Sequence, residues 1–430
     1  MNQEQINKPF SISRQSVFDS WKEVRQNRGS AGIDSVSIKS YEEALVSHLY
    51  KLWNRMSSGT YFPQPVKLVE IPKKDGGKRP LGIPTVNDRI AQTVVVLQIR
   101  ARLDSIFHKD SYAYRPNHNA LEAIAIARQR CWQYDWVPDM DISKFFDTID
   151  HDLLMKAVKR HVSEKWILLY IERWLKVPYA TESGELIART TGVPQGSVIG
   201  SVLANLFLHY VFDRWMEIHY PHIPFERYAD DTICHCRTKR EAATMKAAIT
   251  NRLSACKLKL NEDKTLTVYC KDSRRKLSHE VIAFDFLGYT FRPRASRNFK
   301  TGVIFTNFLP AISRKSKNHI HDTIRSWRLN RRTGIRLIEI DTMITPYVRG
   351  WLNYYGKFYG SLLKSMLQNV NHAIVRWAMH KYKRFNGNFK GAYMWLIRIY
   401  SKNPKLFYHW CSGIIPCYFK LKTVKVRRAV

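Results

Sequence analysis

The sequence predicts an α+β fold class followed by a helical region, and three observations support this prediction. Short strand-like runs alternate with helical segments up to about residue 295. Acidic residues stand at the ends of several of these runs, and from about residue 310 the pattern becomes helical and rich in aromatic residues. With 430 residues and 45% hydrophobic content, the chain can form two or three domains with cores of their own.

The first third of the chain is predicted to place helices on either side of one hairpin. Residues 12–60 are mainly helical in pattern, and glycines mark a tight loop at 27–34. From its own residues this loop is as well explained by an ordinary connection between helices as by a functional role. A strand at 66–72 leads into a glycine turn with Lys73 and Arg79. This basic hairpin fits either a solvated surface or a clamp for a triphosphate. Further helices are expected at 85–107 and 120–132.

The segments up to residue 295 continue the alternation of helices and strands. Helical patterns cover residues 151–176, 198–215 and 241–257. Strand patterns cover residues 258–266 and 283–290. The loop at 193–197 brackets Gln195 between a proline and a glycine, which sets a backbone bend and allows another chain segment to approach closely.

Two adjacent acids, Asp230 and Asp231, stand at the tip of a predicted hairpin between the strand-like runs 223–227 and 232–236. An exposed turn is the ordinary interpretation of an isolated pair, because aspartate is common in turns. A third acid, Asp141, lies in a second short apolar segment and changes this interpretation. If the two segments are neighbours in a sheet, three carboxylates come close together.

Three carboxylates within a few ångströms repel one another, which raises at least one pKa unless divalent cations neutralise them. Mg²⁺ is the natural choice, because it takes few protein carboxylates and keeps coordination positions for substrate phosphates. Two such ions can activate an attacking hydroxyl and stabilise a leaving pyrophosphate, so the pattern indicates nucleotidyl transfer. Asp139 would share a strand face with Asp141 and is its rival for this role.

Positive charge is concentrated in the last third of the chain. The formal net charge is +34, and residues 291–430 contribute +25 of it, with 28 Lys and Arg against only three acids. Such a segment would repel itself without a polyanion, so nucleic acid is the expected partner, bound mainly through its phosphates. Aromatic residues at helical spacing in this region are expected to serve mainly as core.

Cysteine usage and hydropathy give weaker indications about the surroundings of the protein. Seven cysteines form no paired framework, and Cys234-His235-Cys236 alternates along a strand instead of showing zinc-ligand spacing. The first residues show no basic and apolar leader, and no apolar run is long enough to span a bilayer. We therefore expect a reduced, cytoplasmic protein without bound zinc or a membrane partner.

Taken in order, the motifs resemble those of reverse transcriptases encoded by bacterial group II introns, which also act as maturases for their host intron RNA. The matching segments, which span nearly the whole chain, are the loop at 29–34, the hairpin with Lys73 and Arg79, residues 141–146, 194–196, 228–231, 261–264, 286–289 and 346–356. The resemblance implies polymerase fingers and an antiparallel palm sheet, followed by an α-helical thumb or maturase domain. It divides the chain into an N-terminal extension with an RNA-binding loop (1–60), fingers and palm (61–295), thumb or maturase domain (296–385) and a basic C-terminal segment (386–430).

The resemblance also implies roles for the acidic residues. Asp141, Asp230 and Asp231 would be the catalytic ligands of two Mg²⁺ ions, for which Mn²⁺ could substitute, and the Ile142 carbonyl would be a further ligand. Phe146, five residues after Asp141, would be the steric gate against a 2′-hydroxyl on the incoming nucleotide. This spacing favours Asp141 over Asp139 as the metal ligand.

Contacts with nucleotide, primer and RNA are implied in the same way. The dNTP contacts would be Lys73, Arg79, Phe146, Gln195 and Lys264. The primer and template contacts would be Tyr228, Phe286, Leu287, Gly288 and Tyr289. The RNA-binding surface would include Arg28, Arg314, Lys315, Lys317, Arg349, Lys357, Arg376, Lys381, Lys383 and Arg384.

The sequence departs from the family pattern in two places. Ser197 stands where the family usually has a second glycine, and Gly200-Ser201 replaces a usual Ser-Pro pair, which affects the expected fine contacts with the template. No endonuclease pattern follows residue 390, so a nick or fork made by other machinery would supply the primer.

The function predicted from the sequence is RNA-directed DNA synthesis from dNTPs on an RNA template with a DNA primer, joined to binding of the host group II intron RNA and its DNA target site near the bacterial nucleoid. Two alternatives stay open at this point. One is a freestanding reverse transcriptase in phage defence or another host function. The other is a splicing cofactor that binds RNA without polymerising.

Overall fold

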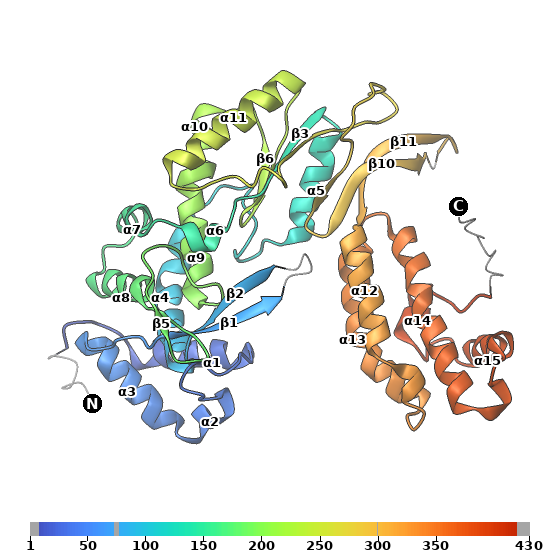
Figure 1. Ribbon diagram of the computed structural model, residues 1–430, viewed down its shortest axis with the longest axis horizontal. Coiled ribbons are helices and arrows are strands. Elements are labelled where there is room, and N and C mark those ends of the chain that lie inside the picture. Colours follow the sequence, from blue (N-terminus) through green and yellow to red (C-terminus); the bar gives the residue numbers. More distant parts are fainter. Residues whose placement is uncertain (1–7, 73–76, 299, 419–430) are drawn as a thin grey trace. The chain divides into compact units, whose positions relative to one another are not determined.

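The computed structural model describes residues 8–72, 77–298 and 300–418 of the chain, which form two compact units (Figure 1). The first unit contains residues up to 127 together with residues 134–267, and the second contains residues 128–133 together with the chain from residue 268 onward. Each unit has its own core, and each is described separately below.

The N-terminal helices are α1 (Arg14–Gln26), α2 (Ile38–Glu43) and α3 (Leu45–Ser58). Ser13 and Ser37 cap the first two by accepting hydrogen bonds from backbone N–H groups three residues later. The sequence predicts a second helix from residue 41 to residue 56, but the structure divides it at Ala44, whose backbone is not helical. Trp53 fastens α3 to the preceding chain by donating to the Ile12 carbonyl at 2.7 Å.

A small sheet with strand order β2-β1-β4-β5 follows these helices. Its strands are β1 (Val66–Pro72), β2 (Lys78–Ile83), β4 (Tyr179–Ala180) and β5 (Leu186–Ile187). β1 and β2 form the predicted antiparallel hairpin. Lys73 lies outside the described residues, as does the side chain of Arg79, so their predicted role in a triphosphate clamp remains a prediction.

The larger sheet has the strand order β6-β7-β3-β8. Its strands are β3 (Trp136–Met140), β6 (Phe225–Tyr228), β7 (Asp231–Cys234) and β8 (Leu266–Tyr269). The strand predicted at 258–266 is wrong, because residues 261–265 form a turn in which the Asn261 carbonyl accepts from the Thr265 N–H at 3.0 Å. Within this range Leu260 forms an isolated bridge to Ile142, and the true strand begins only at Leu266, the last residue of the predicted one.

Helices surround this sheet within the first unit. They are α4 (Val86–Asp104), α5 (Ala120–Cys131, whose last turn belongs to the second unit), α6 (Phe145–Thr148), α7 (His151–Lys159), α8 (Lys165–Lys176), α9 (Val198–Leu208), α10 (Arg214–His219) and α11 (Lys239–Ala255). The sequence predicts helical structure over 151–176 and one helix over 198–215. The first is two helices, and the second is interrupted by a π-helical turn, His209–Asp213.

The second unit joins a three-stranded antiparallel sheet to a helical bundle. The sheet has the order β11-β10-β9, with β9 (Phe284–Phe286), β10 (Tyr289–Arg297) and β11 (Ile304–Ile312). The bundle contains α12 (Arg314–Ser326), α13 (Leu337–Tyr355), α14 (Gly360–Lys381), α15 (Phe389–Lys402) and α16 (Tyr408–Cys411), with 3₁₀ turns at Leu329–Arg331 and Lys383–Phe385. The single strand predicted at 283–290 is instead a hairpin, because Leu287 and Gly288 both have positive φ.

Aromatic residues fill the core of the bundle, as the sequence predicts. Trp377, Tyr393 and Phe407 are almost completely buried. The core also contains one buried polar residue, Asn371, whose Oδ1 accepts from Trp410 Nε1 at 2.9 Å and contacts His409 Nε2 at 2.8 Å. Burial lowers the pKa of His409 to about 3, so the ring is neutral at physiological pH.

We expect Asn371→Ala to destabilise the bundle by about 3 kcal/mol, because it leaves Trp410 Nε1 and the Ile414 carbonyl without their buried partner. Denaturant unfolding followed by tryptophan fluorescence measures the change. Asn386→Ala, at an exposed turn, is the matched control and should be nearly silent. Equal stability of the two variants would contradict the role given to Asn371.

Candidate active site

The predicted acidic hairpin forms one end of the larger sheet. Tyr228 of β6 pairs with Asp231 of β7, so Ala229 and Asp230 are the two residues of a tight turn. Ala229 has a φ of 57°, in the left-handed region that residues with a Cβ rarely adopt. The turn is therefore strained, and the surrounding structure has to hold it in place.

The register of β3 against β7 brings the third acid to the same place. Asp139 pairs with Ile233, and Met140 pairs with Thr232. One step further along the same register, Asp141 stands opposite Asp231. Directly opposed residues of an antiparallel pair share one face, so Asp141 is the acid beside the turn and Asp139 lies two pairs behind it.

The Asp141 carboxylate has two partners from the turn at 261–265. Its Oδ2 accepts from Asn261 Nδ2 at 3.2 Å and lies 3.2 Å from Lys264 Nζ. Asn261 also donates its backbone N–H to the Asp141 carbonyl at 2.8 Å. In the part of the chain that the structure describes, no three His, Cys, Asp or Glu side chains are grouped closely enough to hold a metal ion. The three acids thus stand at neighbouring strand ends without forming a closed cluster, and their role as metal ligands remains a prediction.

Phe146 lies in the short helix α6 directly after these strand ends. Its side chain is buried, and its ring packs edge to face on Phe145 at 5.3 Å. The Phe146 carbonyl accepts from the Val193 N–H at 2.7 Å, which joins α6 to the segment before Gln195. Gly192 allows this approach, since a Cβ there would lie 2.7 Å from the Asp147 carbonyl oxygen.

The Gln195 loop contacts the basic hairpin through its backbone. The Gln195 carbonyl accepts from the Gly82 N–H of β2 at 2.7 Å. A Cβ at Gly196, whose φ is 109°, would lie only 2.5 Å from the Gly82 carbonyl oxygen. The close approach expected from the Pro-Gln-Gly sequence is confirmed, and its partner is a strand more than a hundred residues earlier.

The two departures from the family pattern lie next to each other. Ser197 is the N-cap of α9, because its Oγ accepts from the Gly200 N–H at 3.1 Å. A Cβ at position 200 would lie 2.5 Å from that Oγ. The two departures therefore meet in one helix cap, where a side chain at position 200 would crowd the Ser197 hydroxyl. Gln92, buried in α4, adds a second cap by accepting from the Val198 N–H at 2.9 Å.

Several residues that support the acidic hairpin are not indicated by the sequence motifs. Arg227 and Asp213 form a fully buried ion pair, with Arg227 Nη2 at 2.6 Å from Asp213 Oδ2. On the same strand, buried Glu226 contacts His235 through oxygen and nitrogen atoms 2.6 Å apart. A prediction based on the alternation of hydrophobic residues cannot reveal such pairs, because it assigns every charged residue to the surface.

The predicted primer segment Phe286 to Tyr289 lies in the second unit. Phe286 and Tyr289 have buried side chains. Of this segment, only Leu287 and Gly288, which form the turn between β9 and β10, are therefore available for contact. Tyr354 of α13 donates its hydroxyl to the Leu287 carbonyl at 2.8 Å. This contact brings together two motifs that the sequence analysis singled out separately.

The basic residues predicted to bind RNA divide into exposed and internally used groups. Arg28, Arg314, Lys315, Arg349, Lys357, Arg376, Lys383 and Arg384 are exposed. Lys381 is not, because its Nζ donates to the Ile335 carbonyl at 2.6 Å. Lys317 is partly buried, and burial together with Arg294 and Arg292 lowers its pKa. This group of three cations would gain from a bound anion.

A cavity of about 490 Å³ in the second unit collects further cations. Arg384, Lys390 and Arg398 line it, together with Phe385, Met394 and Trp395. No acidic residue follows Asp341 in the sequence, so these cations gain no neutralising partner from that whole segment. The sequence analysis missed Lys390 and Arg398, although the absence of acids after Asp341 could have indicated them.

The fold and the acidic strand ends define the class of protein as a nucleic-acid polymerase with fingers and palm. The chain belongs to the reverse transcriptase family, because the family model described as reverse transcriptase (RNA-dependent DNA polymerase) matches residues 71–291. The model of the group II intron maturase-specific domain matches residues 317–395. Reverse transcriptases of this family use divalent metal ions.

Similar proteins include Protein YkfC of Escherichia coli K12, with 30% identity over 313 residues, 64% of this chain and 79% of YkfC. The group II intron-encoded protein LtrA of Lactococcus lactis subsp. cremoris is 25% identical over 79% of this chain and 68% of LtrA. A putative COX1/OXI3 intron 1 protein of Saccharomyces cerevisiae is 36% identical, but the match spans only 20% of that protein.

Solved structures of telomerases are also similar. The match to a Candida tropicalis telomerase has 13% identity and a TM-score of 0.43, and it covers 57% of this chain and 55% of that one. The match to a Candida albicans telomerase has 14% identity and a TM-score of 0.45, and it covers 88% and 68%. These scores are too low to add to the assignment.

The family models and relatives confirm the identification as a group II intron-type reverse transcriptase and maturase. They also confirm the fold class, the RNA-directed DNA polymerase activity and the roles in intron splicing and mobility. Intron RNA and nucleic-acid substrates follow from the same two domains. Among the helices of the described residues, none combines the length and apolar character needed to cross a bilayer.

The coupling of Ser197 to Gly200 can be tested by a double-mutant cycle. Gly200→Ala should destabilise the first unit by about 2 kcal/mol, because the new methyl group overlaps the capping hydroxyl. Ser197→Gly alone should cost only a few tenths of a kcal/mol. In the double variant the cost of Gly200→Ala should fall by about 1 kcal/mol, measured by denaturant unfolding. Additive costs would show that the two positions are independent.

Proposed function

We propose that this reverse transcriptase extends a DNA primer with dNTPs on an RNA template, and that Asp141, Asp230 and Asp231 bind the two Mg²⁺ ions of the reaction. The observation that supports this most directly is the register that sets Asp141 opposite Asp231 beside the turn containing Asp230. The donors fit the ion, because carboxylate oxygens are the ligands that Mg²⁺ prefers. When bound, the ions would activate the primer 3′-hydroxyl and stabilise the leaving pyrophosphate.

The contacts of Asp141 also favour a cation at this position. Its carboxylate already attracts the ammonium group of Lys264, which is itself more than half exposed and therefore able to move. Asn261 orients the same oxygen by its hydrogen bond. In the proposed function Lys264 lies near the triphosphate and neutralises charge there, while the Ile142 carbonyl is a further metal ligand.

The remaining contacts of the proposed site are those that the family resemblance implies. Phe146 would exclude the 2′-hydroxyl of a ribonucleotide, and Gln195 would lie beside the new base pair. Lys73 and Arg79 would hold the triphosphate. Tyr228 and the turn at Leu287 and Gly288 would contact the primer end.

The basic second unit supports the RNA-binding part of the proposal. The RNA phosphates would lie against the exposed cations, including those around the cavity of Arg384, Lys390 and Arg398. We propose the cognate group II intron RNA as the ligand, the DNA target site as the substrate of mobility, and the bacterial nucleoid as the place of action. LtrA is named as a group II intron-encoded protein, which is in keeping with this choice of RNA.

Asp141→Asn, Asp230→Ala and Asp231→Ala should each reduce primer extension on an RNA template by more than about 10³-fold, because each removes a proposed metal ligand. Asp139→Asn is the matched control on the same strand face and should change the rate by less than about threefold. A defect in Asp139→Asn without one in Asp141→Asn would exchange their roles. Full activity of either turn variant would refute the metal site.

Splicing of the cognate intron at low Mg²⁺ concentration separates the two activities of the protein. Asp230→Ala should retain splicing assistance, because the RNA-binding surface proposed here lies on other residues. Loss of splicing together with DNA synthesis would show that the two activities depend on one surface.

The triple variant Arg384→Ala, Lys390→Ala, Arg398→Ala should bind intron RNA more weakly. The slope of log affinity against log salt concentration should become shallower by the amount expected for the loss of about two to three phosphate contacts. Filter binding over a range of KCl concentrations measures both quantities. A triple variant of the exposed residues Lys51, Lys156 and Lys165 removes the same charge elsewhere and is the control. An equal loss in both triples would mean that overall charge, and not this cavity, determines binding.

A further inference from the structure

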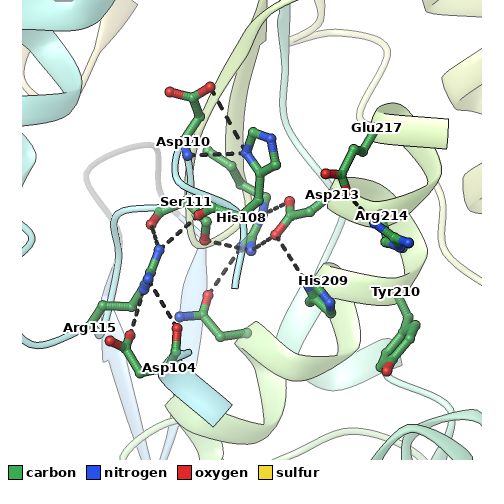
Figure 2. A network of polar contacts seen from close by, with 12 residues as sticks. Asp104, His108, Asp110, Ser111, Arg115, His209, Tyr210, Asp213, Arg214 and Glu217 are labelled. Atoms are coloured by element: carbon green, nitrogen blue, oxygen red, sulfur yellow. Dashed lines mark hydrogen bonds and ion pairs between the residues drawn. The ribbon is translucent and has the colours of Figure 1, made fainter. Parts of the chain in front are cut away.

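The buried side chain of Arg227 lies directly behind the acidic turn. Figure 2 shows a polar network of the first unit in which two of its partners, Ser111 and Asp213, are labelled. Its Nε and Nη2 each donate to one oxygen of Asp213 at 2.6 Å, and Nη2 also donates to Ser111 Oγ at 2.7 Å. Its Nη1 donates to Asn205 Oδ1 and to the Ala229 carbonyl, both at 3.1 Å. All five N–H groups of the guanidinium are therefore used.

These partners come from segments far apart in the sequence. Asn205 belongs to α9, and Asp213 ends the π-helical turn that follows it. A π turn changes the direction of the side chains that follow it, and such turns are often found at functional sites. The interruption of the helix predicted over 198–215 thus sets Asp213 against Arg227.

The backbone of Arg227 is held from a third direction. β6 is the edge strand of its sheet, so its outer side lacks a full neighbouring strand. The segment at Ser111 fills part of this edge, because Arg227 N–H donates to the Asp110 carbonyl at 2.9 Å and Tyr112 N–H donates to the Arg227 carbonyl at 3.0 Å. The strand that carries the turn is therefore fastened at Arg227 on both sides.

One contact distinguishes Arg227 from an ordinary core ion pair. Its bond to the Ala229 carbonyl reaches into the turn, at the residue whose φ is positive and immediately before Asp230. An alanine keeps such a backbone conformation only where the surrounding structure imposes it. A shift of about 1 Å in a catalytic group can cost about a hundredfold in rate.

We propose that Arg227, held by Asp213, is a positioning residue that sets the conformation of the Ala229–Asp230 turn and thereby the placement of the two turn carboxylates. This inference rests on the proposed function of Asp230 and Asp231. It assigns a catalytic consequence to a buried pair that touches neither substrate nor metal.

The matched control is Arg115, which Figure 2 shows in the same network. Arg115 is also largely buried, donates to Asp104 Oδ1 at 2.7 Å and to the Ser111 carbonyl at 2.7 Å, and makes no hydrogen bond to the acidic hairpin among the described residues. Arg115→Lys and Arg227→Lys should therefore both lower stability. Only Arg227→Lys should disturb the turn.

Single-nucleotide incorporation under single-turnover conditions tests the proposal in the full-length protein. Arg227→Lys and Asp213→Asn should lower the maximal rate by about 10- to 100-fold while the affinities for RNA template and dNTP change by less than about threefold. The Mg²⁺ concentration for half-maximal rate should rise in both. Arg115→Lys should leave the rate and the Mg²⁺ dependence within about threefold of the wild type.

A second substitution tests the mechanism itself. Glycine adopts positive φ without the cost paid by alanine, so Ala229→Gly should restore part of the rate in the Arg227→Lys background and none in the Arg115→Lys background. If Arg227→Lys does not fold, Ser111→Ala can replace it, because this variant removes a single hydrogen bond to Arg227. It should lower the maximal rate in the same way but to a smaller extent.

The proposal is overturned if the rate of Arg227→Lys, corrected for its folded fraction, equals that of Arg115→Lys, or if Ala229→Gly restores nothing. A different result would refute the proposed function, namely undiminished primer extension by Asp230→Ala or Asp231→Ala. The two failures are thus distinguishable in the same assay.

Discussion

The pairing register of β3 and β7 is the constraint on which the active site depends. Side chains alternate across a strand, so a slip of one residue would turn Asp141 away from Asp231 and expose the opposite face. The register is held on one side by the tight turn at Ala229 and Asp230. On the other side, the Asn261 and Ser143 backbone bonds fix the chain where β3 ends. The acids are thus placed by backbone pairing before any metal or substrate contributes.

Close backbone contacts extend this constraint to the rest of the first unit. Gly192 and Gly196 let two loops approach the Asp147 and Gly82 carbonyls at distances that a Cβ would prevent. Ser197 and Gly200 show the same principle inside a helix cap. A glycine can therefore be required by a neighbouring side chain as well as by its own backbone angles.

Charge is distributed differently in the two units, for physical reasons that match their roles. In the first unit, the buried carboxylate of Asp213 is paired with the buried guanidinium of Arg227, because an unpaired buried charge is costly. In the second unit, exposed cations such as Lys390 and Arg398 receive no acid from the long segment after Asp341. Paired charges hold the polymerase sheet, while unpaired charges are available to RNA phosphates.

The fold class and most element types could be predicted from the sequence, because hydrophobic periodicity and short motifs act locally. The same motifs singled out the three acids for which a metal-binding role is proposed. The prediction failed at 258–266 and 283–290, where the turns at Asn261 and at Leu287 and Gly288 break an apparently continuous strand pattern. Asp88, Arg89 and Gln92 are polar residues that hydrophobic periodicity would assign to the surface of their helix, whereas all three are buried and hydrogen-bonded within the fold. That Asp141 faces Asp231 and that Arg227 is held behind the turn by Asp213 and Ser111 could be seen only in the three-dimensional structure, since both depend on contacts between segments distant in the chain.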